Sequence, residues 1–130
     1  MIILYLKTSD DTAELYLKDG DKLLAEESWK AGRELSITLH SKIDDILDSN
    51  NLKTTDVEGL AVFKGPGSFT GLRIGITVFN TMAYGLGIPI VSETGEDWVD
   101  DALARLNSKD DEKIVQPFYG GEPNITKPRK

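Results

Sequence analysis

The sequence predicts an α/β fold, a mixed five-stranded β-sheet with flanking helices, and three observations lead to it. Two strand-like runs, 13–18 and 22–28, flank Asp19-Gly20, which is a strong short-range signal for a hairpin. An apolar run at 57–63 has the length of a strand and precedes a glycine-rich turn and a helical pattern. A second short run, 88–91, follows that pattern, and a strand-helix-strand unit requires a right-handed crossover between parallel strands. Antiparallel and parallel pairs therefore share one sheet.

The first part of the chain supplies three strands and a helix. Residues Met1 to Leu6 form a continuous apolar run, which predicts a buried strand ahead of the hairpin. After Ala31-Gly32, apolar residues recur at helical spacing, and Asn50-Asn51 is well placed to end the helix. The apolar positions of this first helix are Leu35, Leu39, Ile43, Ile46 and Leu47.

The second part supplies two more helices. A helix is expected from about Thr70 to about Leu86, followed by a strand at Ile88 to Val91. A third helical pattern precedes a polar, charged loop at 107–113, and residues 114–130 are expected to be extended. The apolar positions of the third helix are Trp98, Val99, Ala102, Leu103 and Leu106.

Length and composition predict one soluble globular unit. The chain has 130 residues, of which 39% are hydrophobic and 28% charged. The net charge of −7 argues against a general nucleic-acid-binding surface, because such binding depends on Lys and Arg contacts to phosphate. Any contact with RNA is therefore expected to be indirect or local. The basic residues 127–130 could touch phosphate or an acidic partner, although a solvated tail is the simpler interpretation.

The absence of cysteine excludes disulfides, thiolate catalysis and cysteine zinc sites, and it agrees with a reducing compartment. The apolar start is interrupted by Lys7, lacks a basic leader, and is too short for a signal peptide or a membrane span. We therefore expect a cytoplasmic protein with no membrane contact.

The glycine-rich turn has two interpretations. Glycines 65, 67 and 71 allow a tight passage from strand to helix, which leaves amide groups at the helix start available to an anion, with Ser68 and Thr70 as possible caps. The spacing Gly-x-Gly-x-x-x-Gly is one residue longer than the dinucleotide fingerprint, and no Gly-Lys-Ser/Thr makes a Walker loop. Spacing alone favours a structural turn whose glycines permit close packing.

The full string Gly-Pro-Gly-Ser-Phe-Thr-Gly-Leu-Arg-Ile-Gly resembles the signature of the TsaB family, also called YeaZ, of tRNA threonylcarbamoyladenosine biosynthesis. The resemblance extends to Arg33-Glu34 at the start of the first helix and to the ending Pro117 to Pro123. The residues that carry the signature are Gly65, Pro66, Gly67, Ser68, Phe69, Thr70, Gly71, Arg73 and Gly75.

The resemblance implies a ribonuclease H-like fold of the actin (ASKHA) type. It covers residues 1–100 and the tail, whereas a typical member has a second domain similar in size to the first. Residues 1–100 are therefore expected to form the family's N-terminal domain, and 101–130 a remnant of the second domain with an extended C-terminal tail. The chain looks like a naturally minimal or truncated member.

Two departures from the family pattern weaken a catalytic interpretation. The family usually has an Asp at the end of the first strand, where a carboxylate can hold a metal-bound water, but this chain has Lys7. A surface or sheet-edge lysine is expected, although its charge could meet a phosphate. Leu35 stands where members often have a histidine, and the only histidine, His40, is expected to be a half-exposed helix residue without a catalytic role. The acidic groups at 44–45, 93–101 and 110–112 are expected to be solvated.

The second helix carries more apolar surface than one sheet requires. Leu72, Ile76, Phe79 and Ala83 suffice to cover the sheet. The excess could be covered by the third helix or the tail, or by another protein. The family resemblance implies cover by another protein, because TsaB proteins pair with the homologous subunit TsaD through the first and second helices. The expected interface residues are Ile37, Ile74, Gly75, Val78 and Met82, with Gly71 and Gly75 allowing close approach.

The resemblance thus implies a non-catalytic scaffold subunit with no catalytic and no metal-binding residue of its own. It would form a heterodimer with a TsaD-like catalytic subunit, act with a TsaE-like ATPase, and form a homodimer when alone. ATP and magnesium are implied for the complex and not for this chain. The alternative is a self-standing nucleotide-binding ATPase or kinase of the actin fold, with Thr8, Ser9 and the turn against phosphate; loss of the first-strand Asp counts against it.

Overall fold

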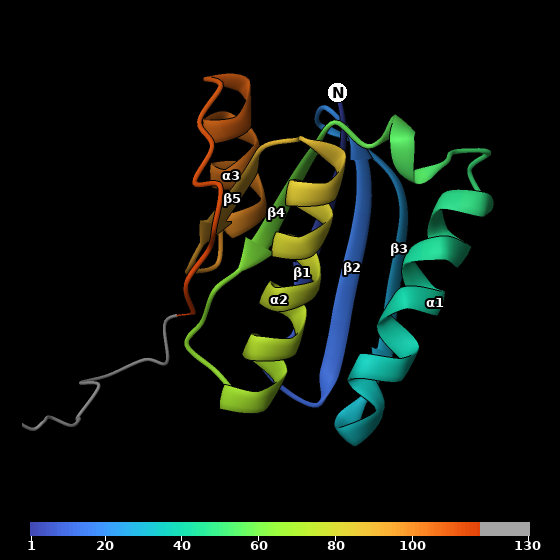
Figure 1. Ribbon diagram of the computed structural model, residues 1–130, viewed down its shortest axis with the longest axis vertical. Helices are drawn as coiled ribbons and strands as arrows, with labels where there is room; N and C mark the ends of the chain where they lie inside the picture. The colour runs from blue at the N-terminus through green and yellow to red at the C-terminus, as the bar shows by residue number, and fades with distance from the viewer. Residues whose placement is uncertain (118–130) are drawn as a thin grey trace, which may run out of the picture.

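The computed structural model describes residues 1–117, and its centre is a mixed five-stranded sheet (Figure 1). The strand order is β3-β2-β1-β4-β5, with β1 antiparallel to β2 and parallel to β4. The expected ribonuclease H-like architecture is therefore confirmed. The strands are β1 (Ile2–Lys7), β2 (Thr12–Asp19), β3 (Lys22–Lys30), β4 (Gly59–Phe63) and β5 (Ile90–Glu93). The basic end and most of the closing family-like motif lie outside the described residues.

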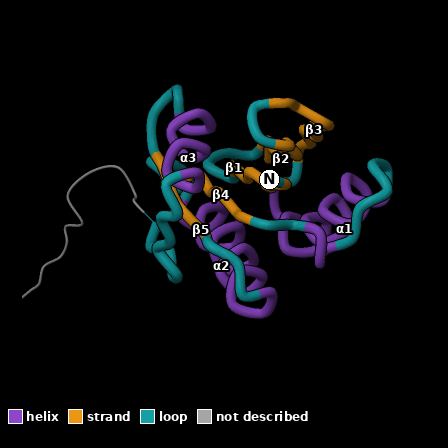
Figure 2. The backbone as a smooth tube through the Cα atoms, turned by 90° about the horizontal axis from the view of Figure 1, so that it is seen from above, coloured by secondary structure: helices purple, strands orange, loops and turns teal. Residues whose placement is uncertain are grey.

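Three helices cover the sheet from both sides. Helices α1 (Leu35–Asp48) and α2 (Phe69–Leu86) lie on one face, and α3 (Trp98–Asn107) lies on the other (Figure 2). Strand β1 supplies both cores because successive side chains point to opposite faces. Leu4 and Leu6 pack with α1 and α2, whereas Ile3 and Tyr5 pack with α3. The third helix therefore cannot cover the outer surface of α2.

The predicted start of the last strand needs a correction of two residues. The sequence placed it at Ile88, but β5 begins at Ile90. Helix α2 ends at Leu86 and is capped by Gly87, which takes a left-handed conformation with φ 67°. The amides of Gly87 and Ile88 both donate to the carbonyl of Ala83. Ile88 thus belongs to the cap of α2, in a geometry that favours glycine at the preceding position.

The α3 side of the sheet contains one buried polar atom with no hydrogen-bond partner among the described residues, the hydroxyl of Tyr5. The ring is fully buried and meets Trp98 edge-on at 6.0 Å between centroids. Burial, assisted by the charge of Asp100, raises the pKa of Tyr5 to about 12. Folding thus favours the neutral phenol. The contribution of Tyr5 to the free energy of unfolding is therefore fully present below pH 10, and it is lost as pH rises toward 12.

Tyr5→Phe is therefore expected to raise the free energy of unfolding at pH 7 by about 1 kcal/mol, because it removes an unpaired buried hydroxyl. Urea unfolding at pH 7 measures the change. The matched control is Tyr16→Phe: the Tyr16 hydroxyl donates to the carboxylate of Glu14, and its loss should cost about 1 kcal/mol. Equal destabilisation by both variants would contradict this account of Tyr5.

The glycine-rich turn and the groove between two helices

The turn between β4 and α2 packs tightly against the segment that follows β1. A Cβ atom added at Gly67 would lie 2.5 Å from both the Cβ and the carbonyl oxygen of Ser9. The amide of Ser68 donates to that same carbonyl at 2.7 Å. Ser68 is also the N-cap of α2, since its hydroxyl accepts from the amide of Gly71 at 3.4 Å, as predicted. Two amides at the start of this helix thus have partners within the chain.

Gly71 and Gly75 continue this contact one and two turns farther along α2. A Cβ at Gly71 would collide with the carbonyl oxygen of Thr8, and one at Gly75 with its hydroxyl oxygen. Thr8 is fully buried, and its hydroxyl donates to the carbonyl of Gly71 at 2.8 Å. The glycine spacing therefore allows α2 to approach the end of β1, which is the structural interpretation of the turn.

This contact corrects one residue of the predicted interface. Gly75 is buried against Thr8 and does not lie on the outer surface of α2. The expectation that Gly71 and Gly75 admit a second protein's helix is wrong for the same reason, because Thr8 already occupies their open side. A signal in the sequence could have shown it: at 100° per residue, Gly75 lies within about 60° of Leu72, on the sheet-facing side.

Lys7 ends the central strand of the sheet, which excludes the sheet-edge position, one of the two that were expected. Its side chain is half-buried, and its ammonium group lies 4.6 Å from the centroid of the Phe63 ring. Hard metal ions such as magnesium are bound by carboxylate and carbonyl oxygens, and a lysine side chain provides neither. Within residues 1–117, no group of three or more His, Cys, Asp or Glu side chains could hold a metal. The end of β1 therefore presents an ammonium group, and no carboxylate, at position 7.

A groove lies between α1 and α2 on the outer side of the sheet. Ile74 and Val78 are half-buried in it, above the core that they help to cover. Polar side chains form the rest of its lining, namely Ser36, His40, Thr70, Arg73 and Thr77. Ile37, on the solvent side of α1, is 74% exposed, and Met82 is half-buried against the core. The groove thus combines an apolar base with a polar rim.

His40 is a groove residue that the sequence interpretation missed. It was expected to be a half-exposed helix residue, but it is exposed and lines the groove together with Ser36. The two residues are four positions apart, and positions with that spacing share one side of a helix. This spacing on α1, taken with the apolar excess on α2, could have indicated that His40 lies beside the groove.

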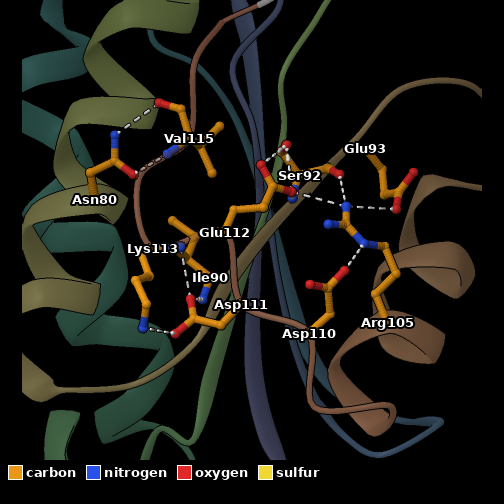
Figure 3. Close-up of polar contacts among 10 residues, drawn as sticks. All are labelled: Asn80, Ile90, Ser92, Glu93, Arg105, Asp110, Asp111, Glu112, Lys113 and Val115. Atoms are coloured by element: carbon orange, nitrogen blue, oxygen red, sulfur yellow. Dashed lines mark hydrogen bonds and ion pairs between the residues drawn. The ribbon is translucent and has the colours of Figure 1, made fainter.

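A second polar site covers the outer edge of β5, and the sequence did not predict it. Residues 110–115, here called the strap, run back along β5 after α3 (Figure 3). Asp111 and Glu112 were expected to be solvated, but both are half-buried and bind the backbone of β5. The expectation of a solvated loop is therefore wrong for these two residues.

The ionisation of Asp111 reflects this burial. Desolvation opposes its charge, but hydrogen bonds from the amides of Ile90 and Lys113, with the Lys113 ammonium, outweigh it and lower the pKa of Asp111. A lowered pKa means that its contribution to stability is present above the ordinary pKa and is lost as pH falls through the lowered value. The strap is thus held partly by charge.

No helix within the described residues is long and apolar enough to cross a membrane.

Comparison with known proteins agrees with this geometry. The family model for TsaD, tRNA N6-adenosine threonylcarbamoyltransferase, matches residues 29–94, which is half of the chain. The tRNA threonylcarbamoyladenosine biosynthesis protein TsaB of Bacillus subtilis is 34% identical over 90 residues, which cover 69% of this chain and 39% of that protein. The tRNA N6-adenosine threonylcarbamoyltransferase of Geotalea uraniireducens is 33% identical over 106 residues, with coverage of 69% and 31%. The chain thus spans about a third of the length of these two relatives.

A solved structure gives the same result. YeaZ from Pseudomonas aeruginosa superimposes with a TM-score of 0.67 at 28% identity, over 72% of this chain and 43% of that one. The glycine-rich signature at 65–75 is the one expected for this family. The chain belongs to the TsaB (YeaZ) family.

Proposed function

We propose that this chain is a non-catalytic subunit in the biosynthesis of threonylcarbamoyladenosine in tRNA. In this role it binds and activates a TsaD-like catalytic subunit, which transfers threonylcarbamoyl to the adenosine beside the anticodon. A TsaE-like ATPase completes the complex, and ATP and magnesium bind to those subunits. The relatives named for this modification support the pathway, and the sites of this chain support the division of labour.

The observation that carries the proposal is the open α1–α2 surface, with Ile37 exposed beside a groove that has an apolar base. Helix α3 lies on the opposite face of the sheet. The described end of the chain passes on the other side of α2, where Val115 bonds to Asn80. An apolar base with a polar rim is typical of surfaces that bind protein partners. Binding of tRNA would be indirect, in keeping with the net charge of −7.

The end of β1 supports a non-catalytic role. Lys7 replaces the carboxylate that metal-assisted phosphate chemistry needs at this position, and its ammonium group is directed over the Phe63 ring. The glycines of the turn contact Thr8 and Ser9, so they make packing contacts where a phosphate loop would present free backbone. Both features favour a supporting subunit over a self-standing nucleotide enzyme.

The test is reconstitution with the TsaD-like protein of the same source. The two chains are expected to copurify, and the complex should modify tRNA faster than the TsaD-like protein alone. Calorimetry of the isolated chain should show no tight binding of magnesium-ATP. Neither complex nor stimulation would refute the proposal, and tight magnesium-ATP binding would favour the nucleotide-enzyme alternative instead.

A further inference from the structure

The outer side of α2 is exposed but almost uncharged. Arg73 is the only charged residue of this 18-residue helix, although 28% of the whole chain is charged. Most of the exposed residues recur at spacings of three and four, so they form one stripe along the helix, here called the α2 stripe. Its exposed residues are Phe69, Thr70, Arg73, Thr77, Thr81, Tyr84 and Gly85. A solvated helix face normally carries more charge than this.

The composition of the α2 stripe is typical of the centre of a protein interface. Such centres are depleted in Lys, Glu and Asp and enriched in Arg and aromatic residues. Phe69, at the start of the helix, is 54% exposed, and Tyr84, near its end, is 90% exposed. The stripe also borders the groove between α1 and α2, because Thr70, Arg73 and Thr77 line it. Stripe and groove thus form one surface along α2.

Arg73 is positioned on this surface by an aromatic ring. The central carbon of its guanidinium lies 5.1 Å from the centroid of the Phe69 ring, four residues earlier on the same helix. Arg73 is exposed, and within residues 1–117 no carboxylate forms an ion pair with it. The ring therefore restricts the side chain, and the N–H donors of the guanidinium are available to a second molecule.

We propose that the TsaD-like partner presents a carboxylate to Arg73, and that this ion pair fixes the orientation in which the two subunits bind. The inference rests on the proposed function and adds the chemistry of the partner's surface. A guanidinium that becomes buried on binding needs an acceptor, and a carboxylate matches its fork of N–H donors with two parallel hydrogen bonds. Since the α2 stripe has one cation and no anion, an acidic side chain matches it at one position only.

Calorimetric titration with the TsaD-like protein of the same source, in the absence of tRNA, tests the ion pair. Arg73→Met keeps a long apolar side chain but removes the charge, and it should weaken binding by about 10-fold to 100-fold. Arg73→Lys keeps the charge without the planar fork and should lose less affinity than Arg73→Met. Lys22→Met is the matched control, because it removes an exposed positive charge on β3. It should change the affinity by no more than about 2-fold.

Phe69→Leu tests whether the ring positions the guanidinium. This variant keeps the charge of Arg73 and an apolar side chain at position 69, but it removes the aromatic face. Binding should weaken by about 2-fold to 5-fold, the effect of one exposed cation–π contact. In a chain that already carries Arg73→Met, the same change should have a smaller effect, because no cation is left for the ring to hold.

Charge reversal tests for the carboxylate on the partner. Arg73→Glu should weaken binding at least as much as Arg73→Met, because two carboxylates would then face each other. The Asp and Glu residues of the partner are then changed to Arg one at a time. One of these partner variants should bind the Arg73→Glu chain at least about 10-fold more tightly than the unmodified partner does. The absence of any such variant would overturn the proposed ion pair.

Other results would also reject the ion pair. Equal affinity in Arg73→Met and the unmodified chain would do so, as would an equal loss in Lys22→Met. A loss that appears only when tRNA is present would assign Arg73 to phosphate. A lower unfolding midpoint in Arg73→Met would place the acceptor within the same chain, and lost self-association with unchanged partner affinity would place it on a second copy.

The unmodified chain separates this inference from the proposed function. If it does not bind the TsaD-like protein, the proposed function fails and the inference fails with it. If it binds and the Arg73 variants bind equally well, the inference alone is wrong.

Discussion

Gly75→Ala is expected to lower the free energy of unfolding by about 2–3 kcal/mol, although alanine is the better helix former. The added methyl group would overlap the hydroxyl oxygen of Thr8 and approach a methyl group of Leu6 at 3.2 Å. Both neighbours are fully buried, so neither can move aside without disturbing the core. Urea unfolding followed by circular dichroism measures the loss.

Gly85→Ala is the matched control, because it makes the same substitution in the same helix. A Cβ at Gly85 has open space, with no atom within 4 Å. Here only helix propensity operates, and the variant should gain about 0.5–1 kcal/mol. The double variant Thr8→Ala/Gly75→Ala should lose less free energy of unfolding than the two single variants together, because alanine at position 8 has no hydroxyl group for the new methyl group to overlap. A Gly75→Ala protein as stable as Gly85→Ala would show that the contact with Thr8 does not restrict the turn.

Ile37→Asp is expected to weaken binding of a TsaD-like subunit by about 10-fold to 100-fold. Ile37 is 74% exposed, so the change costs the isolated chain little, while in a complex it would bury an unpaired charge. Titration by calorimetry or surface plasmon resonance gives the dissociation constant. The unfolding midpoint should stay close to that of the unmodified chain.

Leu23→Asp provides the comparison, since Leu23 is 48% exposed on the edge strand β3, away from the α1–α2 surface. The variant introduces the same charge in place of another exposed aliphatic side chain. It should change the affinity for the TsaD-like subunit by no more than about 2-fold. Equal loss of affinity in both variants would indicate a general charge effect, and no loss at Ile37 would place the partner elsewhere.

The architecture could be predicted because its signals are local. The hairpin depends on Asp19-Gly20, where Gly20 has φ 61°, and the helices follow from apolar spacing. Helix α1 buries the same five apolar residues that the sequence nominated. The signals failed at Ile88, because periodicity does not distinguish a helix cap from the start of a strand.

The candidate sites were only partly predictable. The apolar excess on α2 predicted that Ile74 and Val78 lie outside the sheet contact, but the position of Gly75 depends on the distance between α2 and Thr8. The strap depends on residues separated by 20 positions, Ser92 and Glu112, and no spacing in the sequence connects them. An acidic run has the same composition whether it is solvated or bonded to a strand.

The central position of β1 also has a consequence for the order of folding. Its pairing with β2 joins residues close in sequence, such as Leu4 and Leu17, whereas its pairing with β4 joins Leu4 to Leu60. Contacts that close short loops form faster than contacts that close long ones. The three-stranded meander can therefore assemble first and serve as the template on which β4 docks. Both cores then close around a strand whose pairing with β2 is already in place.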